Sequence, residues 1–304
     1  MRPNFDLARQ LAEESVDDWQ FGALSQPGIV SIPERERDAY LPVGETQFSK
    51  RDDFQDCASR SPVNHLEALF TYHYKHGMKP ENKKWLEDNG YIKDGRVEFS
   101  DRHVAVGSNT TRQGNSLKGP IDFIRKNGLI PKKLLPKEEW MTWEDYHDKS
   151  KITQAMKDLG LSFIRRFTIN YEQVRLNHFA EALKDDMIGV AGYAWPMPVN
   201  GLYPKTEGTF NHAFLVYKLP KYQVYDNYYD YTNQGQQIVG DFTKNLAPDY
   251  ALYEYGYRVY LSAENVVDDT VLTVWQTLAK YGLTSFFADW YIRFQKTLKG
   301  MLKL

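Results

Sequence analysis

The pattern of the chain changes near residue 186, and this change restricts the possible fold more than any other feature of the sequence. Before it, apolar residues recur at the spacing of one helix face, most clearly over residues 63–76. After it come runs rich in β-branched and aromatic residues, at 187–195, 212–219, 223–229 and 250–261. Helical and strand-forming segments that are separated along a chain indicate an α+β fold rather than an alternating α/β fold.

Further elements are expected outside these runs. Helical patterns occur again after residue 262 and in three earlier segments, 116–127, 150–160 and 171–184. Residues 81–115 are polar and carry turn signals, so no regular element is predicted there. A turn-rich stretch with several prolines predicts that residues 1–46 form an extended arm over the body of the protein.

Composition excludes several classes of protein. The 304 residues include 38 Lys+Arg and 40 Asp+Glu, and the net charge of −2 argues against a nucleic-acid binder that works by bulk positive charge. A hydrophobic share of 42% is not that of a disordered chain, and the length suggests two domains or one large two-lobed domain. The longest uncharged stretch, 187–204, contains three prolines, so it cannot be one continuous membrane-spanning helix.

The sequence also bears on the compartment. The first residues lack the apolar stretch of a secretory signal, so no signal peptide is predicted. The single cysteine, Cys57, excludes an internal disulfide and fits a reducing environment. We expect a cytoplasmic or virion-associated protein.

One thiol, one downstream histidine and one asparagine form the main candidate site. Cys57 stands just before a helical pattern, where the helix dipole and unpaired N–H groups stabilise a thiolate. His212 opens a predicted strand and Asn227 lies on the next one, so a hairpin would bring these side chains together. The imidazole can then deprotonate the thiol while an amide fixes the orientation of the ring. Gln47, ten residues before Cys57, is the candidate donor to an oxyanion.

The order of these residues resembles that of papain-like cysteine peptidases. The matching positions, in chain order, are Gln47, Cys57, Asn211-His212-Ala213 and Asp226-Asn227. His212 follows Cys57 by 155 positions, close to the spacing typical of the family. The segment GNSLKGPIDFIRKNGLIPKKLLP (114–136) resembles the helix and Gly-Leu-Ile-Pro stretch between the family's lobes. The run CASRSPVNHLE resembles divergent members from phage and uncultured microbes.

This resemblance implies a two-lobed α+β fold with the substrate cleft between the lobes. Residues 47–185 would form a helical lobe that carries the nucleophile, and residues 186–262 an antiparallel, β-barrel-like lobe that carries the histidine and asparagine. Residues 1–46 would be an N-terminal arm or a short pro-segment, and residues 263–304 an added helical tail. The implied substrate is a polypeptide.

Two assignments within the site leave alternatives open. The gap between Gln47 and the cysteine is longer than is usual in the family, so Gln55 is a second candidate donor to the oxyanion. Asp226 is an alternative to Asn227 as the partner of His212, since it directly precedes Asn227 on the same predicted strand and its carboxylate could also orient the ring.

The helix start and the shielding residues also differ from the family pattern. If the helix begins at Ser61-Pro62, with Ser61 as the cap, the thiol of Cys57 lies outside the first turn and is less activated. Tyr228-Tyr229 stands where the family has Ser-Trp, and a tyrosine ring there would shield the imidazole from water.

Other motifs are interpreted as structural. Gly107-Ser108-Asn109 and Gly114-Asn115-Ser116 lack the lysine of a phosphate loop and are predicted turns; in a papain-like fold one of them would line the substrate groove. His73 and His76 have no second cysteine or carboxylate pair to complete a metal site, so they are expected to belong to a solvated helix end. No metal or cofactor is predicted.

The last segment has a character of its own. Residues 283–304 have a broad apolar face and a basic remainder, which is typical of a helix that binds a membrane surface or a protein partner. Packing on the body of the protein or on a second subunit is the alternative.

Three functions fit these features. The first is a cysteine peptidase that uses Cys57, His212 and Asn227. The second is an inactive papain-like scaffold with a structural or interaction role, such as a phage virion protein, because a fold does not determine a function. The third is a cell-wall amidase, since Asp56-Cys57 and the run HAFLVY resemble short motifs of peptidoglycan hydrolases.

Overall fold

A computed structural model describes residues 5–13, 29–193, 195–206, 208–219, 221–232 and 235–262. The described α-helices are α1 (Leu7–Glu13), α2 (Arg37–Tyr40), α3 (Cys57–His76), α4 (Pro80–Asp88), α5 (Asp101–Gly107), α6 (Lys118–Asn127), α7 (Trp143–Tyr146), α8 (Gln154–Arg166) and α9 (Phe179–Asp185). Short 3-10 helices are η1 (Glu34–Glu36), η2 (Lys132–Leu134), η3 (Lys149–Lys151) and η4 (Leu176–His178). The strands are β1 (Ile29–Val30), β2 (Ile92–Lys93), β3 (Arg96–Val97), β4 (Ile169–Arg175), β5 (Ile188–Gly192), β6 (His212–Lys218), β7 (Gln223–Tyr225), β8 (Asp230–Tyr231), β9 (Gln237–Ile238), β10 (Thr243–Asn245) and β11 (Tyr255–Ser262).

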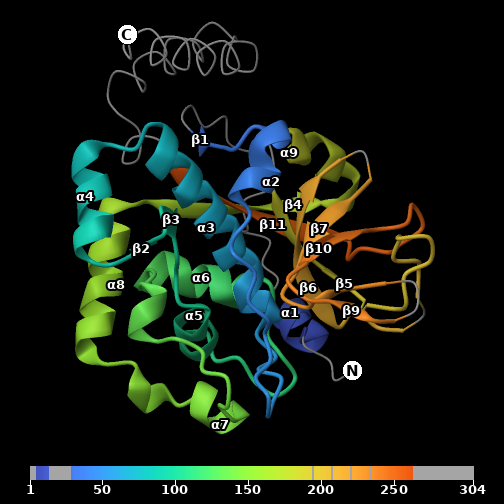
Figure 1. The fold of residues 1–304 in the computed structure, drawn as a ribbon, viewed down its shortest axis with the longest axis horizontal. Coiled ribbons are helices and arrows are strands. Elements are labelled where there is room, and N and C mark those ends of the chain that lie inside the picture. The colour runs from blue at the N-terminus through green and yellow to red at the C-terminus, as the bar shows by residue number, and fades with distance from the viewer. Residues whose placement is uncertain are drawn as a thin grey trace, which may run out of the picture.

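Helices and strands are segregated, as expected for an α+β fold. Figure 1 shows most helices on one side, the main sheet on the other, and α3 running between them. The main sheet is antiparallel and has the order β1-β11-β5-β6-β7-β10, with β4 also paired to β11. The α+β prediction is therefore confirmed, whereas the predicted tail 263–304 lies outside the described residues.

The antiparallel pair β6–β7 determines which residues meet at one end of the sheet. β6 begins at His212, opposite Gly192 of β5, and β7 ends at Tyr225. The start of one strand and the end of the next are neighbours in an antiparallel pair. The pairing shifts by one residue between Val216 and Lys218, which is a β-bulge.

Helix α3 is the central element of the fold. It begins at Cys57, and the N–H groups of Ser59 and Arg60 both donate to the carbonyl of Asp56, at 2.8 and 2.9 Å. The alternative start at Ser61-Pro62 is wrong, since Pro62 lies inside the helix. Every residue from Cys57 to His73 is buried, because helices pack on one side of α3 and the sheet on the other.

Two predicted segments differ from the structure. The helix expected over 171–184 is wrong for residues 171–175, which belong to β4 and pair with β11. The remainder is helical, as the short 3-10 helix η4 followed by α9. Residues 81–115 contain α5 and most of α4, although no element was predicted there. In both cases packing against neighbouring elements outweighs the local pattern.

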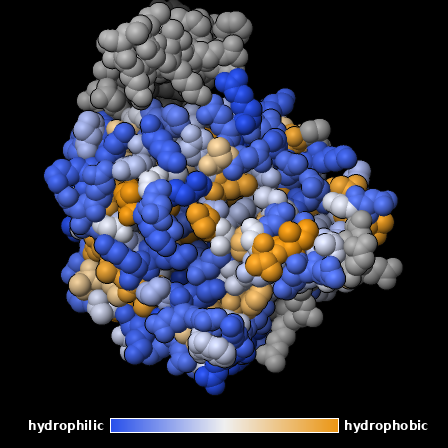
Figure 2. All heavy atoms as spheres, viewed as in Figure 1, coloured by the Kyte–Doolittle hydropathy of each residue, from blue (hydrophilic) through white to orange (hydrophobic). Residues whose placement is uncertain are grey.

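The described residues pack around a large hydrophobic core, and the face drawn in Figure 2 is mostly hydrophilic. One large hydrophobic core contains residues of α3, α6, α8 and the main sheet, and Cys57 belongs to it. On the face shown in Figure 2, exposed apolar residues form small separate patches among hydrophilic ones. Among the described helices, none combines the length and apolar character that a bilayer crossing requires.

Helix α6 ends at Gly128, which lies against the backbone of Gly160 in α8. Gly128 has a φ of +74°, and a Cβ there would lie 1.9 Å from the carbonyl oxygen of Gly160 in α8. We expect Gly128→Ala to lower the free energy of unfolding by roughly 2–3 kcal/mol more than Gly95→Ala. Gly95 is the matched control, since its φ is +72° and no described atom lies within 4 Å of its Cβ position. Urea denaturation measures both, and equal losses would contradict the close packing of α6 on α8.

A buried histidine makes the stability depend on pH. His103 of α5 is 2% exposed, and burial lowers its pKa to about 4. The unfolded chain binds a proton at this residue below about pH 6.5 and the folded protein does not, so stability falls as the pH drops from 6.5 towards 4. We expect His103→Gln to reduce the loss of unfolding free energy between pH 7 and pH 5 by roughly 2 kcal/mol.

Denaturation curves at the two pH values provide this measurement. The parent protein, measured in parallel at both pH values, is the control. An unchanged pH dependence in His103→Gln would show that this residue is protonated in the folded protein.

Candidate active site

Cys57 is the first residue of α3 and lies against β6. A hydrogen bond from the backbone of Ala213 reaches its sulfur, and one turn later the hydroxyl of Ser61 donates to the carbonyl of Phe214 at 3.1 Å. These two contacts fix the helix along the strand. Because Ala213 follows His212 directly, the structure brings the predicted nucleophile and the predicted base to neighbouring positions.

The thiol is held in a neutral, enclosed state. Cys57 is 1% exposed, and burial raises its pKa well above the ordinary value. The negative charges of Asp226, Asp56 and Asp53 act in the same direction, and the hydrogen bond from Ala213 acts against it. The position at the helix N-terminus, which favours a thiolate, does not outweigh these effects in this conformation.

The imidazole of His212 is bound by Asp226, not by Asn227. Its Nε2 atom lies 2.8 Å from Oδ1 of Asp226, and both side chains are buried. Nδ1 has no hydrogen-bond partner among the described residues. A carboxylate at Nε2 holds the ring in one orientation and leaves Nδ1 to exchange a proton.

The bulge in β6 explains why Asp226 takes this place. On the His212 side of the bulge, Leu215 pairs with Tyr225. The same register places Asp226 opposite Phe214, so its side chain lies on the face of the sheet that His212 also occupies. A one-residue shift moves every side chain of a strand to the other face. The predicted contact between Asn227 and His212 is therefore wrong, and the alternative partner, Asp226, makes it.

Asn227 instead connects the sheet to the helical side. Its Oδ1 accepts from Nδ2 of Asn64 at 2.8 Å, and its own Nδ2 donates to the carbonyl of Glu45 at 2.8 Å. The carbonyl of Asn227 accepts from the N–H of Gln47 at 3.0 Å. Asn64 lies two turns after Cys57 on α3, so Asn227 fixes the end of β7 relative to the helix that carries the thiol.

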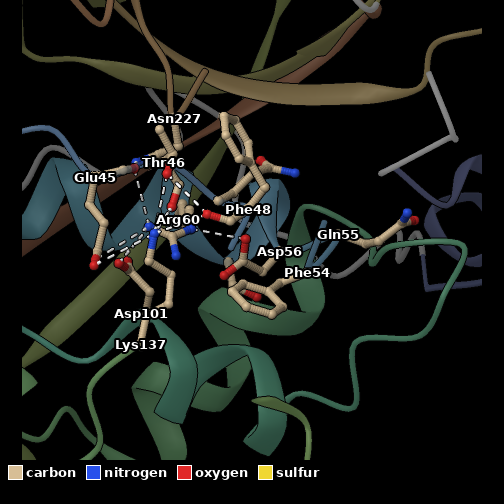
Figure 3. A network of polar contacts seen from close by, with 12 residues as sticks. Glu45, Thr46, Phe48, Phe54, Gln55, Asp56, Arg60, Asp101, Lys137 and Asn227 are labelled. Carbon is tan, nitrogen blue, oxygen red and sulfur yellow. Dashed lines mark hydrogen bonds and ion pairs between the residues drawn. The ribbon is translucent and has the colours of Figure 1, made fainter. Parts of the chain in front are cut away.

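The amide of Gln47 is committed to other partners. Its Nε2 donates to Oδ1 of Asp53 and to the hydroxyl of Tyr228, both at 2.9 Å, and the residue is fully buried. Both amide protons are thus used, and the assignment of Gln47 as oxyanion donor is not supported by this geometry. The alternative, Gln55, has a φ of 59°, and Figure 3 shows its side chain directed away from Asp56.

Aromatic rings enclose the imidazole. The rings of Tyr228 and Trp195 lie edge-on to that of His212, with centroids 5.1 and 5.6 Å away. Nε1 of Trp195 donates to Oδ2 of Asp226. The contact expected of Tyr228 is present, while Trp195 was not identified from the sequence.

A buried charge network supports the start of α3 (Figure 3). Nε of Arg60 donates to Asp56 at 2.9 Å, and Nη1 donates to Asp101 at 3.0 Å and lies 3.8 Å from a carboxylate oxygen of Glu45. The hydroxyl of Tyr146 donates to the second oxygen of Asp56 at 2.5 Å. The carboxylate of Asp56 is therefore fixed directly before the thiol. The i, i+4 spacing of Asp56 and Arg60 was the available sequence signal for this network.

The N-terminal arm contacts both sides of the site. The N–H of Phe5 donates to the carbonyl of Asn211 at 3.1 Å, directly before His212. The N–H of Asp6 donates to the carbonyl of Asn115 at 3.0 Å, within one of the two turns expected near a substrate groove. One short segment thus binds the helical side and the sheet side at once.

Helix α1 continues this bridge. Nε2 of Gln10 donates to the hydroxyl of Tyr255 at 2.6 Å, and Oε1 of Gln10 accepts from the N–H of Leu117 at 2.7 Å. Nη2 of Arg9 donates to the carbonyl of Ser108 at 3.0 Å. Contacts of this kind hold the arm on the body of the protein.

No group of three metal-ligating side chains occurs among the described residues. His73 is buried in α3 rather than solvated, and burial lowers its pKa to about 3. His76 pairs with the hydroxyl of Tyr40 at 2.5 Å. Both histidine rings pack against the ring of Tyr72, so the two residues belong to one aromatic cluster near the end of α3.

Comparisons with known proteins identify the fold. No protein-family model matches the sequence, and a search of curated proteins finds no match either. The structure of proCathepsin B S9 from Trypanosoma congolense is similar with a TM-score of 0.53 at 11% identity, over 86% of this chain and 87% of that one. Xylellain, a cysteine protease from Xylella fastidiosa, gives a TM-score of 0.46 at 12% identity, over 82% of this chain and 93% of that one. The fold is papain-like, as the sequence predicted.

Arg60 is the residue on which the charge network depends. Arg60→Met leaves Asp56 and Asp101 buried without their shared cation, so we expect the free energy of unfolding to fall by about 3–5 kcal/mol at pH 7. Urea denaturation followed by circular dichroism measures the change. Arg112→Met, which removes a half-exposed ion pair with Glu144, is the matched control and should have a much smaller effect. Similar effects of the two substitutions would mean that the network does not stabilise the helix start.

Proposed function

We propose that the chain is a cysteine peptidase of the papain-like type, which acts on polypeptides through Cys57, His212 and Asp226. The observation that carries this proposal is the position of Cys57 at the N-terminus of α3, in contact with the residue that follows His212, while Asp226 binds Nε2 of that histidine. Thiol, imidazole and carboxylate in this order are the groups that nucleophilic amide hydrolysis requires.

In the proposed reaction, Nδ1 of His212 accepts the thiol proton and the sulfur of Cys57 attacks the carbonyl carbon of the amide. The new C–S bond forms as the carbonyl oxygen becomes an oxyanion. The imidazolium then gives its proton to the leaving nitrogen as the C–N bond breaks. Water, deprotonated by His212, attacks the thioester, which releases the acid product and restores the thiol.

The proposed oxyanion donors are the first backbone N–H groups of α3, those of Cys57 and Ala58, since the N–H groups of Ser59 and Arg60 donate to the carbonyl of Asp56. Such groups point out of a helix end and carry its partial positive charge. Gln47 has no part in this proposal, because Asp53 and Tyr228 occupy its amide protons.

The arm gives the proposed enzyme a latent resting state. Phe5 and Asp6 bind backbone carbonyls on the sheet side and on the helical side, one of them adjacent to His212, and both Cys57 and His212 are buried. A substrate would have to replace these contacts. We assign residues 5–13 the role of a pro-segment, in agreement with the enclosed neutral thiol.

An inactive scaffold is the second candidate, and the burial of Cys57 favours it. A thiol that is 1% exposed, with a raised pKa, is the ordinary state of a structural cysteine. In that case the fold would serve an interaction role, and the phage-like run CASRSPVNHLE points to a virion as the setting.

Loosening the arm separates the two candidates. In the full-length double variant Phe5→Ala/Gln10→Ala, we expect alkylation of Cys57 by iodoacetamide at pH 7.5 to rise by about tenfold, because a larger share of the molecules is open. Adding His212→Gln should slow it by about 100-fold. Since the chain has one cysteine, the incorporated label reports on this site alone. The loosened variant should also cleave an unfolded polypeptide such as casein, and Cys57→Ser should abolish the cleavage.

Ala8→Ser, at an exposed position of α1, is the control for the arm and should leave the alkylation rate unchanged. If the loosened variant cleaves no polypeptide and alkylates at the same rate with and without His212→Gln, the scaffold is the correct reading.

A further inference from the structure

Lys244 of β10 is a lysine buried behind the candidate site. Its Nζ atom lies 3.5 Å from Oδ2 of Asp226 and donates to the carbonyl of Tyr228 at 2.6 Å. It also lies over the ring of Trp195, 5.2 Å from the centroid. The flanking residues of β10 are half-buried, while Lys244 points inward. Lysine is almost never fully buried unless it is paired, so this position requires a physical reason.

Asp226 is the group that Lys244 pairs with. Oδ1 of Asp226 accepts from Nε2 of His212 at 2.8 Å and from the N–H of Asn227 at 2.7 Å. Oδ2 faces Nε1 of Trp195 and the ammonium group of Lys244. The carboxylate is thus held by two sets of partners, one for each oxygen, and its orientation toward the imidazole is fixed.

The charges around this pair explain why a cation is needed. Burial alone raises the pKa of Asp226, but His212, Lys244 and the hydrogen bonds lower it below the ordinary value, so the group is ionised. Burial lowers the pKa of Lys244, and Asp226, Asp230 and Asp241 act against this.

Other acidic groups add to the negative potential at the thiol. Asp53 and Asp56 lie on the helical side of Cys57, where both raise its pKa. Asp56 has Arg60 as its cation, 2.9 Å away. Within the described residues, Lys244 is the lysine that pairs with Asp226, and no arginine pairs with this carboxylate.

We infer that Lys244 is a positioning residue, and that the Asp226–Lys244 pair acts as one neutral acceptor that orients His212 without leaving a net negative charge beside the thiol. This inference rests on the proposed function for the role of His212. An asparagine could by itself supply a neutral acceptor for the Nε2–H of His212. Here the carboxylate of Asp226 and the buried ammonium group of Lys244 supply it together. The pair should therefore be replaceable as a unit but not one member at a time.

A double-mutant cycle tests this inference through the pH dependence of Cys57 alkylation. In the Phe5→Ala/Gln10→Ala background, the iodoacetamide rate is measured from pH 5 to pH 10. Lys244→Met leaves an extra negative charge near the thiol, so the midpoint should move up by roughly one pH unit. Asp226→Asn leaves an extra positive charge, so the midpoint should move down. The double variant Asp226→Asn/Lys244→Met should return to within about 0.3 pH unit of the parent.

Lys244→Gln is the second variant, because an amide can still donate to the carbonyl of Tyr228; it should shift the midpoint in the same direction as Lys244→Met. Lys218→Met, which removes a part-exposed ion pair with Asp38 at the other end of β6, is the control and should not move the midpoint. A midpoint that stays fixed in both Lys244 variants, even with a lower urea midpoint, would overturn the inference and leave Lys244 a structural role.

Polypeptide cleavage, followed in the same variants, separates this inference from the proposed function. Shifted alkylation profiles without cleavage in any variant would support the ion-pair inference and count against the peptidase. Polypeptide cleavage with an unshifted alkylation profile in the Lys244 variants would support the peptidase and count against the ion-pair inference.

Discussion

The docking of α3 on β6 is the contact on which the rest of the structure depends. The helix carries Cys57 at its first residue and Ser61 one turn later, and both bind the backbone of β6 next to His212. Nearly the whole helix is buried, so its position is determined by packing on every side. Residues that are 155 positions apart in the sequence thereby become neighbours.

Two buried charge clusters lie on opposite sides of the thiol. Arg60 neutralises Asp56 on the helical side, and Lys244 neutralises Asp226 on the sheet side. Isolated charges in such surroundings are costly, whereas paired and hydrogen-bonded ones are tolerated. The arrangement gives the region around Cys57 fixed dipoles and pairs instead of water, which suits a site that works by proton transfer.

The sequence was sufficient to predict the papain-like fold and the proximity of Cys57 to the strand that begins at His212, because residue type, order and spacing carry that information. It was insufficient where a shift of one residue in the β6–β7 pairing determined which side chain contacts His212. Had the pairing of Lys218 with Gln223 continued without the bulge, Asn227 would lie opposite Phe214 and share the face of His212. The assignment of Gln47 as oxyanion donor failed for another reason. Its amide donates to the hydroxyl of Tyr228, and the spacing of residues near Gln47 does not reveal a partner from so distant a segment. Lys244 carried no signal, since a lysine in a polar stretch is ordinarily solvated.

The hydrogen bond between Gln10 and Tyr255 joins residues 245 positions apart, and this separation has a consequence for biosynthesis. The ribosome completes α1 long before Tyr255 exists, so this helix must wait for β11, the last strand among the described residues. Contacts of such long range form late in folding, because a large loop has to close first. Helix α1 therefore docks only on a molecule whose sheet is already assembled.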